Sequence, residues 1–543
     1  MPSLTAKEIV DRSNRLKGDR INWDSWWQDL AKHCVPRKAD VTEKKTPGTK
    51  FDTDIYDSTA RDSIKVFAAG LMGYLTNPAS PWFKLRAQNS AVMKDSKVAT
   101  FYANAEHEIN NVFHVSNFYQ QLHEFYIHIG FIGTSAFYSE EDTEDGIRYY
   151  TRRASEILFD LDHRERLLNV YRPFELDAQQ AALRWGDDAG KSVLEAMKAK
   201  KFEEKFEFIQ CVGPRGARDP KKKDRLNKPF HSTWVNVKDQ KKVYESGFEE
   251  MPFHIARFSK EPHEKYGYSP AMDVLPDIKM ANKMKYIIIR ASMKATDPPV
   301  LLPHQGYLLP LNFNPRAVNY KLQSTGTSSD EQIQFLDHKG NIQVGRDILL
   351  DVQETIKRAF FVDLFLLLAD RKNMTATEVQ ERVEEKMLIL GPAIGQLQNE
   401  LLQPVISRTF NILLRSGRLG DPPQALLNNP DYRVEYVSVL AKAQKFSEAR
   451  SVMGFVTSIA EISKVYPETV DKLDADAVVD KIAEVTGQDP ALLRDDKAIL
   501  KLRGERQQQQ EIANKLALAQ QGAEVVKTGG EAVKTMGGGN GAG

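Results

Sequence analysis

The residue types that most often perform chemistry are present in this chain, but their spacing does not fit a reactive site. His123 and His128 are five residues apart, which places them on different faces of a helix. Histidines that bind zinc from one helix prefer spacings of three or four. His33 and Cys34 are adjacent, so they would point apart on a helix. We therefore predict neither a metal site nor a nucleophile from these residues.

Acidic residues cluster in one stretch, and paired acids can perform acid–base catalysis. The cluster consists of Glu378, Glu381, Glu384 and Glu385. Arg382 and Lys386 lie among them on a predicted long helix, which favours a salt-bridged exposed face. No GxxxxGK[ST] loop is present, and no GxGxxG turn follows a predicted strand. The sequence therefore predicts no enzyme and no bound cofactor.

Basic residues dominate the segment 214–225 (PRGARDPKKKDR). Its lysines Lys221, Lys222 and Lys223 could contact phosphate groups. No aromatic side chain is interleaved for base stacking, and charge runs in loops are usually solvated. We interpret the segment as a solvated loop, with nucleic-acid contact as the alternative.

The composition is typical of a large protein with enough apolar residues to form hydrophobic cores. The chain has 543 residues, of which 41% are hydrophobic, and its formal net charge is +1. Balanced charge excludes a polycationic nucleic-acid coat protein, and this apolar fraction excludes wholesale disorder. Two cysteines cannot form a disulfide framework in such a chain, which favours a reducing compartment. No segment approaches the roughly 20 apolar residues that span a bilayer, so no transmembrane helix is predicted.

The periodicity of apolar residues predicts helices mixed with strands. Helical spacing recurs in residues 4–30, 57–75, 95–129 and 177–200, and strand-like patterns recur in 131–171 and 205–258. Asp57 and Ser58 can cap the second of these helices.

The middle of the chain has the clearest pattern, because two long predicted helices flank a short strand-like insert. The first helix spans 270–295 and is stopped by Asp297-Pro298-Pro299, and the second spans 346–368. A polar break at 370–374 then separates the second helix from a third and very long one.

The third helix contains internal prolines. Gly391-Pro392 and Pro404 are expected to kink it, because a proline removes one backbone hydrogen bond. After Asp421 the sequence predicts further helix, and it ends in a glycine-rich tail that is expected to be disordered.

Four features in a fixed order carry a resemblance to a known family. They are residues 67–85 (FAAGLMGYL, then NPASPWFKL), residues 266–271 (YGYSPA), the helix–insert–helix arrangement, and residues 373–379 (NMTATEV). Together they resemble the portal, or head-to-tail connector, proteins of tailed bacteriophages, in particular the short-tailed podovirus type. The resemblance covers about residues 1–420.

The resemblance implies an α+β, mainly helical portal fold and a ring of about twelve subunits at one capsid vertex. The implied regions are a wing (1–268), a first stem helix (269–296), a β-rich clip (297–345), a second stem helix (346–369), a tunnel loop (370–374), a kinked wing helix (375–420), a crown (421–520) and a disordered tail (521–543).

The resemblance also implies partners and a place in the virion. Double-stranded DNA would pass through the ring, and the terminase large subunit, tail adaptor or nozzle proteins, and major capsid and scaffolding proteins would contact it, without a membrane. The ring would be assembled in the host cytoplasm and lie at the head–tail junction. The residues expected to meet DNA are Arg371, Lys372 and Asn373 of the tunnel loop and Lys283 and Lys357 of the stem.

Two other classes of protein are weighed against a portal. A helical scaffold or adaptor protein of a virion, without a channel, would share the composition and helix content. A nuclease would need acidic residues that converge on Mg²⁺, and no motif marks such a cluster. A ring of about twelve subunits would decide against the scaffold.

Overall fold

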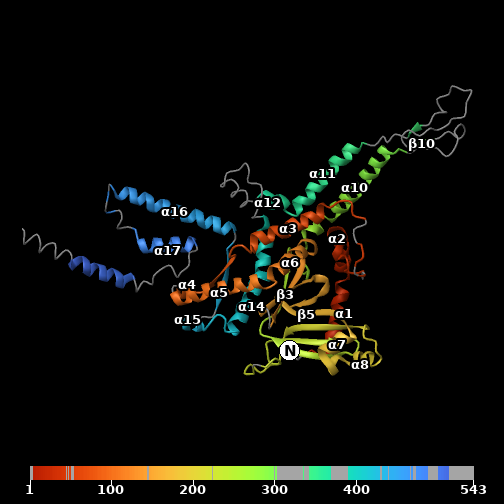
Figure 1. Cartoon of the computed structure of the whole chain (residues 1–543), viewed down its shortest axis with the longest axis horizontal. Helices are drawn as coiled ribbons and strands as arrows, with labels where there is room; N and C mark the ends of the chain where they lie inside the picture. The colour runs from red at the N-terminus through yellow and green to blue at the C-terminus, as the bar shows by residue number, and fades with distance from the viewer. Residues whose placement is uncertain are drawn as a thin grey trace, which may run out of the picture. The chain divides into compact units, whose positions relative to one another are not determined.

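The computed structural model forms two compact units (Figure 1). It describes residues 4–43, 46, 48–50, 54–93, 95–142, 146–222, 224–298, 300–301, 334–335, 341–367, 389–428, 431–437, 439–464, 466, 468, 473–486 and 499–512. The first unit comprises Met1–Phe83, His107–Arg418 and Tyr436–Leu440, and the second comprises Lys84–Glu106, Leu419–Glu435 and Ala441–Gly543. Helices and strands are mixed along the chain, which confirms the predicted α+β class.

Helices begin the first unit, and side-chain caps fix where they start. Thr5 and Glu8 form a capping box at the first helix, in which each side chain accepts a hydrogen bond from the other residue's backbone N–H. Asp57 accepts from the Thr59 N–H at 2.9 Å, whereas the Ser58 side chain makes no capping bond. The helices are α1 (Ala6–Asp19), α2 (Ile21–Cys34), the 3₁₀ turn η1 (Pro36–Lys38), α3 (Thr59–Leu75), the part of α5 (Ser96–Val115) from His107 onward, and α6 (Phe118–Ile132).

Two antiparallel sheets follow in the first unit. The three-stranded sheet has the order β3-β2-β9, and the five-stranded sheet has the order β4-β5-β6-β7-β8. The strands are β2 (Thr134–Asp142), β3 (Gly146–Arg153), β4 (Leu158–Leu161), β5 (Leu167–Asp177), β6 (Lys205–Pro214), β7 (Phe230–Asn236), β8 (Lys241–Phe248) and β9 (Phe253–Arg257).

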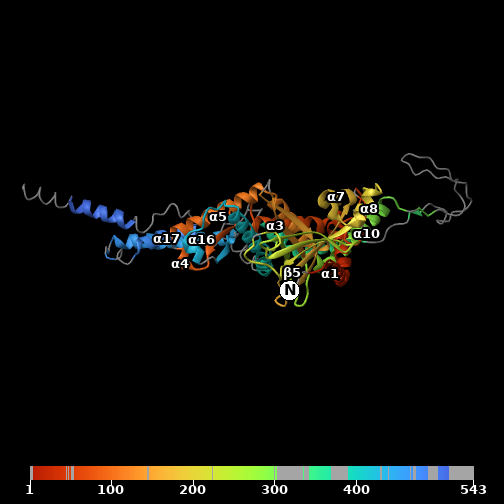
Figure 2. The same ribbon diagram turned by 90° about the horizontal axis from the view of Figure 1, so that it is seen from below.

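Helices cover both faces of the five-stranded sheet (Figure 2). Phe206 and Phe208 of β6 face α7 (Ala178–Trp185) and α8 (Lys191–Lys198). Ile209 and Cys211 point to the opposite face, where α1 packs. This alternation follows from the two-residue period of a strand. The predicted helix at 177–200 is thus two helices, which the 3₁₀ turn η3 (Gly186–Ala189) separates.

The basic segment 214–225 lies in the connection between β6 and β7. Arg215 donates a hydrogen bond to Glu245 at 2.7 Å, and the Arg225 guanidinium lies over the Tyr244 ring. Arg218, Lys221 and Lys222 are exposed, in agreement with the interpretation as a solvated loop.

The two long helices of the middle region are each interrupted once. The first divides at Val274 into α9 (Pro270–Asp273) and α10 (Leu275–Thr296). Pro276, in the first turn of α10, has no N–H with which to continue the hydrogen-bond ladder of α9. The second divides at Phe361, whose φ is +56°, into α11 (Ile342–Ala359) and α12 (Val362–Leu367).

The insert between these helices contains one described strand pair. Val300–Leu301 (β10) pairs antiparallel with Gln334–Phe335 (β11). The rest of 302–340, the polar break at 370–374 and the glutamate cluster at 378–385 lie outside the described residues.

The third long helix is described from residue 389. Pro392 lies within helical residues 389–397 and does not end the helix there. The predicted irregularity at Pro404 takes the form of a π-helical turn, Gln398–Leu402, immediately before α14 (Gln403–Arg415). Single π turns of this kind often lie at functional positions in helices.

The second unit contains helices and one strand pair. The prediction of helix alone after Asp421 was wrong at β12, which pairs with β1. Its described elements are β1 (Phe83–Ala87), α4 (Ser90–Met93), the part of α5 up to Glu106, α15 (Gln424–Asn428), β12 (Tyr432–Tyr436), α16 (Val439–Ser463), α17 (Ala475–Thr486) and helical residues 499–512. The glycine-rich tail lies outside the described residues.

Candidate functional site: the helical hairpin and its base

The most prominent feature of the first unit is an antiparallel helical hairpin formed by α10 and α11, which projects from the unit's sheets and helices (Figure 1). Ile278 of α10 and Leu349, Val352 and Ile356 of α11 are buried. On α11 these residues recur at steps of three and four, as one buried helix face requires. Asn341 caps α11 by accepting from the N–H groups of its first turn.

A buried carboxylate fastens the hairpin to the segment before α3. Asp57 accepts a hydrogen bond from Gln353 Nε2 of α11 at 2.5 Å, and its carboxylate lies 3.4 Å from the Lys285 ammonium of α10. Burial alone would raise the pKa of Asp57, but the hydrogen bonds from Thr59 and Gln353 and the attraction to Lys285 together lower it. The carboxylate is therefore held in its charged form where both helices meet α3.

An asparagine in the middle of α10 holds the same segment by its backbone. Asn282 Oδ1 accepts from the N–H groups of Tyr56 and Asp57 at 2.7 and 3.2 Å, and its Nδ2 donates to the Asp54 carbonyl at 3.0 Å. The Tyr56 and Tyr286 rings lie 4.8 Å apart. One polar side chain thus satisfies three backbone groups that lie far away in the sequence.

The entry to the hairpin is a tight turn at 266–270. Ser269 Oγ donates to the Phe131 carbonyl at 3.0 Å and accepts from the Met272 N–H, while the Gly267 N–H donates to Thr134 Oγ1 at 2.7 Å. Gly133 has a φ of +78°, and a Cβ on it would lie 2.4 Å from the Gly267 carbonyl oxygen. Only glycine allows this backbone approach.

A second close contact at a glycine positions α12, the short helix that follows the hairpin. A Cβ on Gly70 of α3 would lie 2.3 Å from the Phe365 ring of α12. Phe67, one turn earlier on α3, contacts the rings of Phe360 and Phe365 edge to face. The segments at 67–75 and 266–271, which carry the sequence resemblance, therefore both support the base of the hairpin.

The π-helical turn is tied to the three-stranded sheet by an ion pair. Glu400 accepts hydrogen bonds from the Arg257 N–H and Nε of β9 at 3.0 and 3.2 Å. One turn into α14, Arg408 is buried and donates to Ser139 Oγ at 2.9 Å and to the Glu250 carbonyl at 3.0 Å. Arg408 also forms an ion pair with the Glu250 carboxylate at 3.2 Å, so two ion pairs hold this helix in place.

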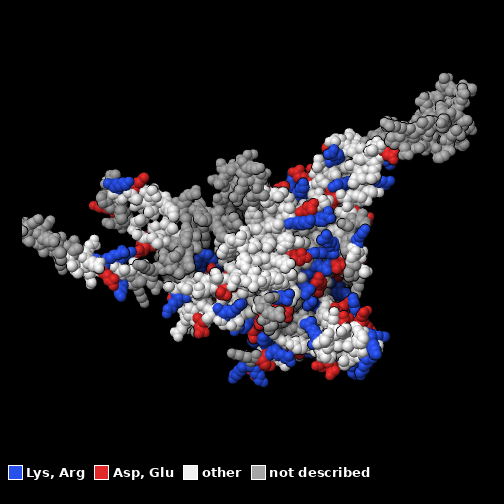
Figure 3. All heavy atoms as spheres, viewed as in Figure 1, with Lys and Arg blue, Asp and Glu red and all other residues white. Residues whose placement is uncertain are grey.

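Apolar side chains are exposed along the hairpin. Met280 and Ile287 of α10 are 45% and 53% exposed, and Leu350 of α11 is 59% exposed. Met280 and Ile287 are seven residues apart and share one face of α10. The face of the hairpin visible in Figure 3 is mostly neither acidic nor basic, with single charges scattered over it.

Two of the predicted DNA-contacting residues lie on this hairpin. Lys283 and Lys357 are exposed, and neither has an ion-pair partner among the described residues. Arg371, Lys372 and Asn373 lie outside the described residues. The structure thus leaves the tunnel-loop residues as a prediction.

The described residues provide neither a metal-binding cluster nor a readily ionised cysteine. No group of three or more His, Cys, Asp or Glu residues there could hold a metal ion. Burial raises the pKa of both Cys34 and Cys211 to about 12, so neither thiol ionises readily. Among the described helices, none combines the length and apolarity that a bilayer crossing needs.

Sequence reasoning missed most of the polar residues that hold the hairpin. Asp57 was predicted only as a helix cap, and Asn282, Gln353 and Arg408 were not singled out. One signal was available for Arg408 and Asn282, since each polar residue lies close to the apolar stripe of its helix. Their partners lie more than 150 residues away, where one sequence gives no indication of them.

The chain is similar to known proteins along nearly its whole length. Residues 6–493 match the family described as bacteriophage head to tail connecting protein. The chain is 30% identical over 524 residues to the "Probable portal protein" of Bordetella phage BPP-1, covering 95% of this chain and 94% of that protein. It is also 30% identical over 538 residues to the "Portal protein" of Salmonella phage epsilon15, covering 97% and 96% of the two chains.

One solved structure is also similar. A chain from a structure titled "Virion of native gene transfer agent (GTA) particle" matches with a TM-score of 0.35 and 10% identity, over 78% of this chain and 94% of that chain. This likeness is too low to support an argument.

The family description concerns the joining of two parts of a virion, which is a structural role and not a reaction. The match spans most of the chain, and it confirms the resemblance to head-to-tail connector proteins. The chain belongs to the bacteriophage head-to-tail connecting protein family.

Proposed function

We propose that this chain is a portal subunit, of which about twelve copies form a ring at one capsid vertex. DNA enters the head through this ring during packaging and leaves through it during ejection. Membership of the head-to-tail connecting family and two phage relatives named as portal proteins support this function.

The hairpin is the single observation that carries the proposal. Its exposed apolar residues, such as Met280, Ile287 and Leu350, have no cover in one copy of the chain. Exposed apolar patches mark interaction surfaces, and identical subunits that meet by two different faces close into a ring when the rotation allows it. We infer that α10 of one subunit packs beside α11 of the next.

The charge pattern suits a channel in which DNA slides. The formal net charge is +1, so the ring would add little counterion-release affinity to hold the duplex in place. We propose Lys283 and Lys357 on the stem and Arg371, Lys372 and Asn373 in the tunnel loop as the sparse contacts to DNA phosphates. Few phosphate contacts favour transient rather than tight binding.

The regions of the chain then have separate roles. The clip at 297–345 projects beyond the stem toward the terminase large subunit during packaging and toward tail adaptor or nozzle proteins afterwards. The wing at 1–268 faces the major capsid and scaffolding proteins, and the kinked helix at 375–420 joins the tunnel loop to the crown at 421–520. Assembly takes place in the host cytoplasm before the ring becomes part of the virion.

Electron microscopy of the purified full-length chain tests the proposal. We expect closed rings with an axial opening and a mass near about twelve times 61.5 kDa. A monomer, a small closed oligomer or an open filament at the same protein concentration would overturn it. Such a result would favour the alternative of a virion scaffold or adaptor without a channel.

A further inference from the structure

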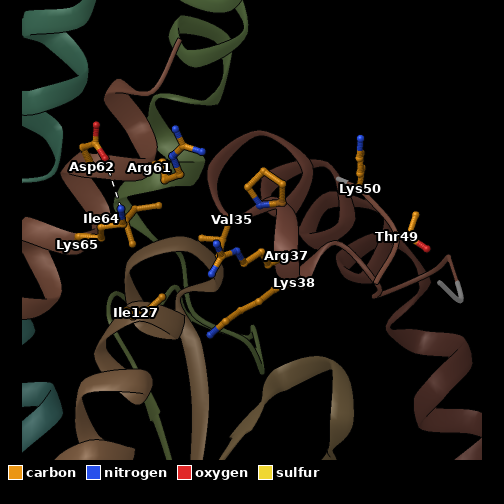
Figure 4. Close-up of a pocket in the computed structure, with 11 residues that line it drawn as sticks. Val35, Arg37, Lys38, Thr49, Lys50, Arg61, Asp62, Ile64, Lys65 and Ile127 are labelled. Atoms are coloured by element: carbon orange, nitrogen blue, oxygen red, sulfur yellow. Dashed lines mark ion pairs between the residues drawn. The ribbon is translucent and has the colours of Figure 1, made fainter. Parts of the chain in front are cut away.

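A cavity beside the start of α3 concentrates positive charge (Figure 4). Its volume is about 570 Å³, and it lies among η1, residues 49–50, α3 and α6 of the first unit. The charged residues that line it are Arg37, Lys38, Lys50, Arg61, Asp62 and Lys65. None of these belongs to the hairpin on which the proposed function depends.

Two of the five cations are already partnered. Lys38 forms an ion pair with Glu124, and its Nζ lies 2.9 Å from His128 Nε2. Lys65 lies 3.6 Å from Asp62, which is the one acidic residue among the described residues that line the cavity.

The other three cations are Arg37, Lys50 and Arg61. Within the described part of the chain, none of them has a hydrogen-bond or ion-pair partner. Among the described residues that line the cavity, positive charge therefore exceeds negative charge. Concave sites of one charge sign focus the field and attract counter-ions.

Apolar side chains line the cavity together with these cations. Ile64 and Ile127 are among them, and Figure 4 shows the Arg37 side chain extending toward these two residues, whereas Lys50 points away. Arg61 is the third residue of the 17-residue helix α3, and Arg37 belongs to η1. Two guanidinium groups on different elements thus stand around one opening.

We propose that this cavity binds phosphate groups. Guanidinium groups form bidentate, charge-assisted hydrogen bonds with phosphate oxygens. The described residues that line the cavity include no aromatic side chain for base stacking, and their guanidinium groups recognise phosphate. The volume lies within the range of small-ligand pockets and exceeds what one carboxylate fills. The phosphates come from a nucleic-acid backbone or from a free polyphosphate.

The test uses the purified full-length chain with two probes, sodium tripolyphosphate and a fluorescent DNA duplex. The pocket variant is Arg37→Gln/Arg61→Gln. The matched control is Arg15→Gln/Arg164→Gln, which removes two exposed guanidinium groups elsewhere in the first unit. We expect the tripolyphosphate Kd to rise at least about tenfold in the pocket variant and to stay unchanged in the control, because hydrogen bonds to charged groups contribute that much.

The two sources of phosphate give different results. If a nucleic acid is the ligand, the pocket variant also binds duplex more weakly, and the slope of log K against log salt falls by about 2. If a free polyphosphate is the ligand, duplex binding is the same in all three proteins. Arg37→Lys/Arg61→Lys, which keeps the charge but loses the fork geometry, is expected to bind tripolyphosphate with intermediate affinity.

Two outcomes overturn the proposal. One is equal tripolyphosphate binding by the natural chain and the pocket variant, both of which must give the same circular dichroism spectrum. The other is tighter binding of a polyglutamate peptide than of tripolyphosphate, which would assign the cavity to an acidic protein segment. Ring formation is scored separately by microscopy, so failure here leaves the portal function untouched.

Discussion

The Asp57 carboxylate lies 3.4 Å from the Lys285 ammonium, an ion pair that joins the start of α3 to α10 across 228 residues of sequence. Gln353 of α11 donates to the same carboxylate, so one side chain holds both helices of the hairpin. The direction in which the hairpin leaves the first unit therefore depends on a buried charge rather than on apolar packing alone. A charge held in this way has measurable consequences.

Asp57→Asn is expected to loosen the base of the hairpin. The Asp57 side chain is only 5% exposed, and asparagine keeps its size but loses the attraction to Lys285 and the charge-assisted bonds. We expect a local destabilisation of about 1–3 kcal/mol. Faster hydrogen–deuterium exchange in α11 would report it. Asp62→Asn, which removes an exposed acid from the first turn of α3, should change exchange little, and equal effects of the two variants would contradict this role for Asp57.

The same carboxylate predicts a loss of stability in acid. The pKa of Asp57 is lowered from its ordinary value of 3.8, because the hydrogen bonds from Thr59 and Gln353 outweigh the effect of burial. A carboxyl whose folded pKa is depressed contributes stability above its unfolded pKa and loses it as the pH falls through the folded value. Exchange in α11 should therefore rise below about pH 4 in the natural chain, after correction for the intrinsic rate. Asp57→Asn should show a smaller rise over the same range.

Gly70→Ala is expected to displace α12. The added methyl group would lie 2.3 Å from the Phe365 ring, so the ring or the helix must move, at a cost of about 1–3 kcal/mol. Gly73→Ala is the matched control on the same helix, because no atom lies within 4 Å of its Cβ. Alanine in a helix interior should be neutral or stabilising there by up to about 1 kcal/mol. Thermal unfolding of both variants distinguishes them, and a similar loss in both would show that Gly70 does not seat Phe365.

Local signals in the sequence predicted most helices and strands, because caps and periodicity act over a few residues. Asp177 with Gln180 and Ser269 with Met272 form such local caps at the starts of their helices. The remaining features of the fold depend on packing between residues that are far apart in the sequence. Phe361 adopts a φ of +56° within an apolar run that reads as continuous helix, because its neighbours pack on α3.

The two helices of the hairpin could be predicted from the sequence, but the polar contacts that hold them to the rest of the first unit could not. The pattern of α10 and α11 gave the helices and the insert, whereas Asp57 and Asn282 acquire their roles only through partners more than 220 residues away. The strand β12 was missed for the same reason, since its partner β1 lies near the other end of the chain.

Ile287→Asp is expected to weaken ring assembly without unfolding the subunit. Ile287 is 53% exposed in one copy, so a charge there should change the stability of the single subunit little. At the proposed interface between α10 of one subunit and α11 of the next, the same charge would be buried without a partner. Leu183→Asp is the control, because Leu183 is 80% exposed on α7, away from the hairpin. Mass photometry should show fewer rings for Ile287→Asp alone. Normal rings in that variant would show that this face of α10 is not part of the proposed interface between subunits.

Arg371→Gln/Lys372→Gln is expected to impair DNA packaging or retention while rings still form. These two residues are the proposed cations of the tunnel loop, and each phosphate contact adds salt-dependent affinity for DNA. Packaged genome length in particles carrying the variant, measured beside ring counts, tests this. Arg218→Gln/Lys222→Gln in the exposed β6–β7 loop is the control for lost charge. Full-length packaging in the tunnel-loop variant would contradict the proposal that Arg371 and Lys372 contact DNA in the channel.

Glu106 in the second unit predicts a loss of stability as the pH rises. Burial raises the pKa of Glu106 to about 7, although the Leu85 N–H donates to its Oε1 at 2.7 Å and favours the charged form. The folded chain thus binds a proton that the unfolded chain releases near pH 4.5, so stability falls as the pH rises from about 4.5 to 7 and is constant beyond. Exchange in β1, corrected for intrinsic rate, should be slower at pH 5 than at pH 8. Glu106→Gln should abolish this difference and Glu108→Gln should preserve it, whereas a difference that persists in Glu106→Gln would assign the titration to another group.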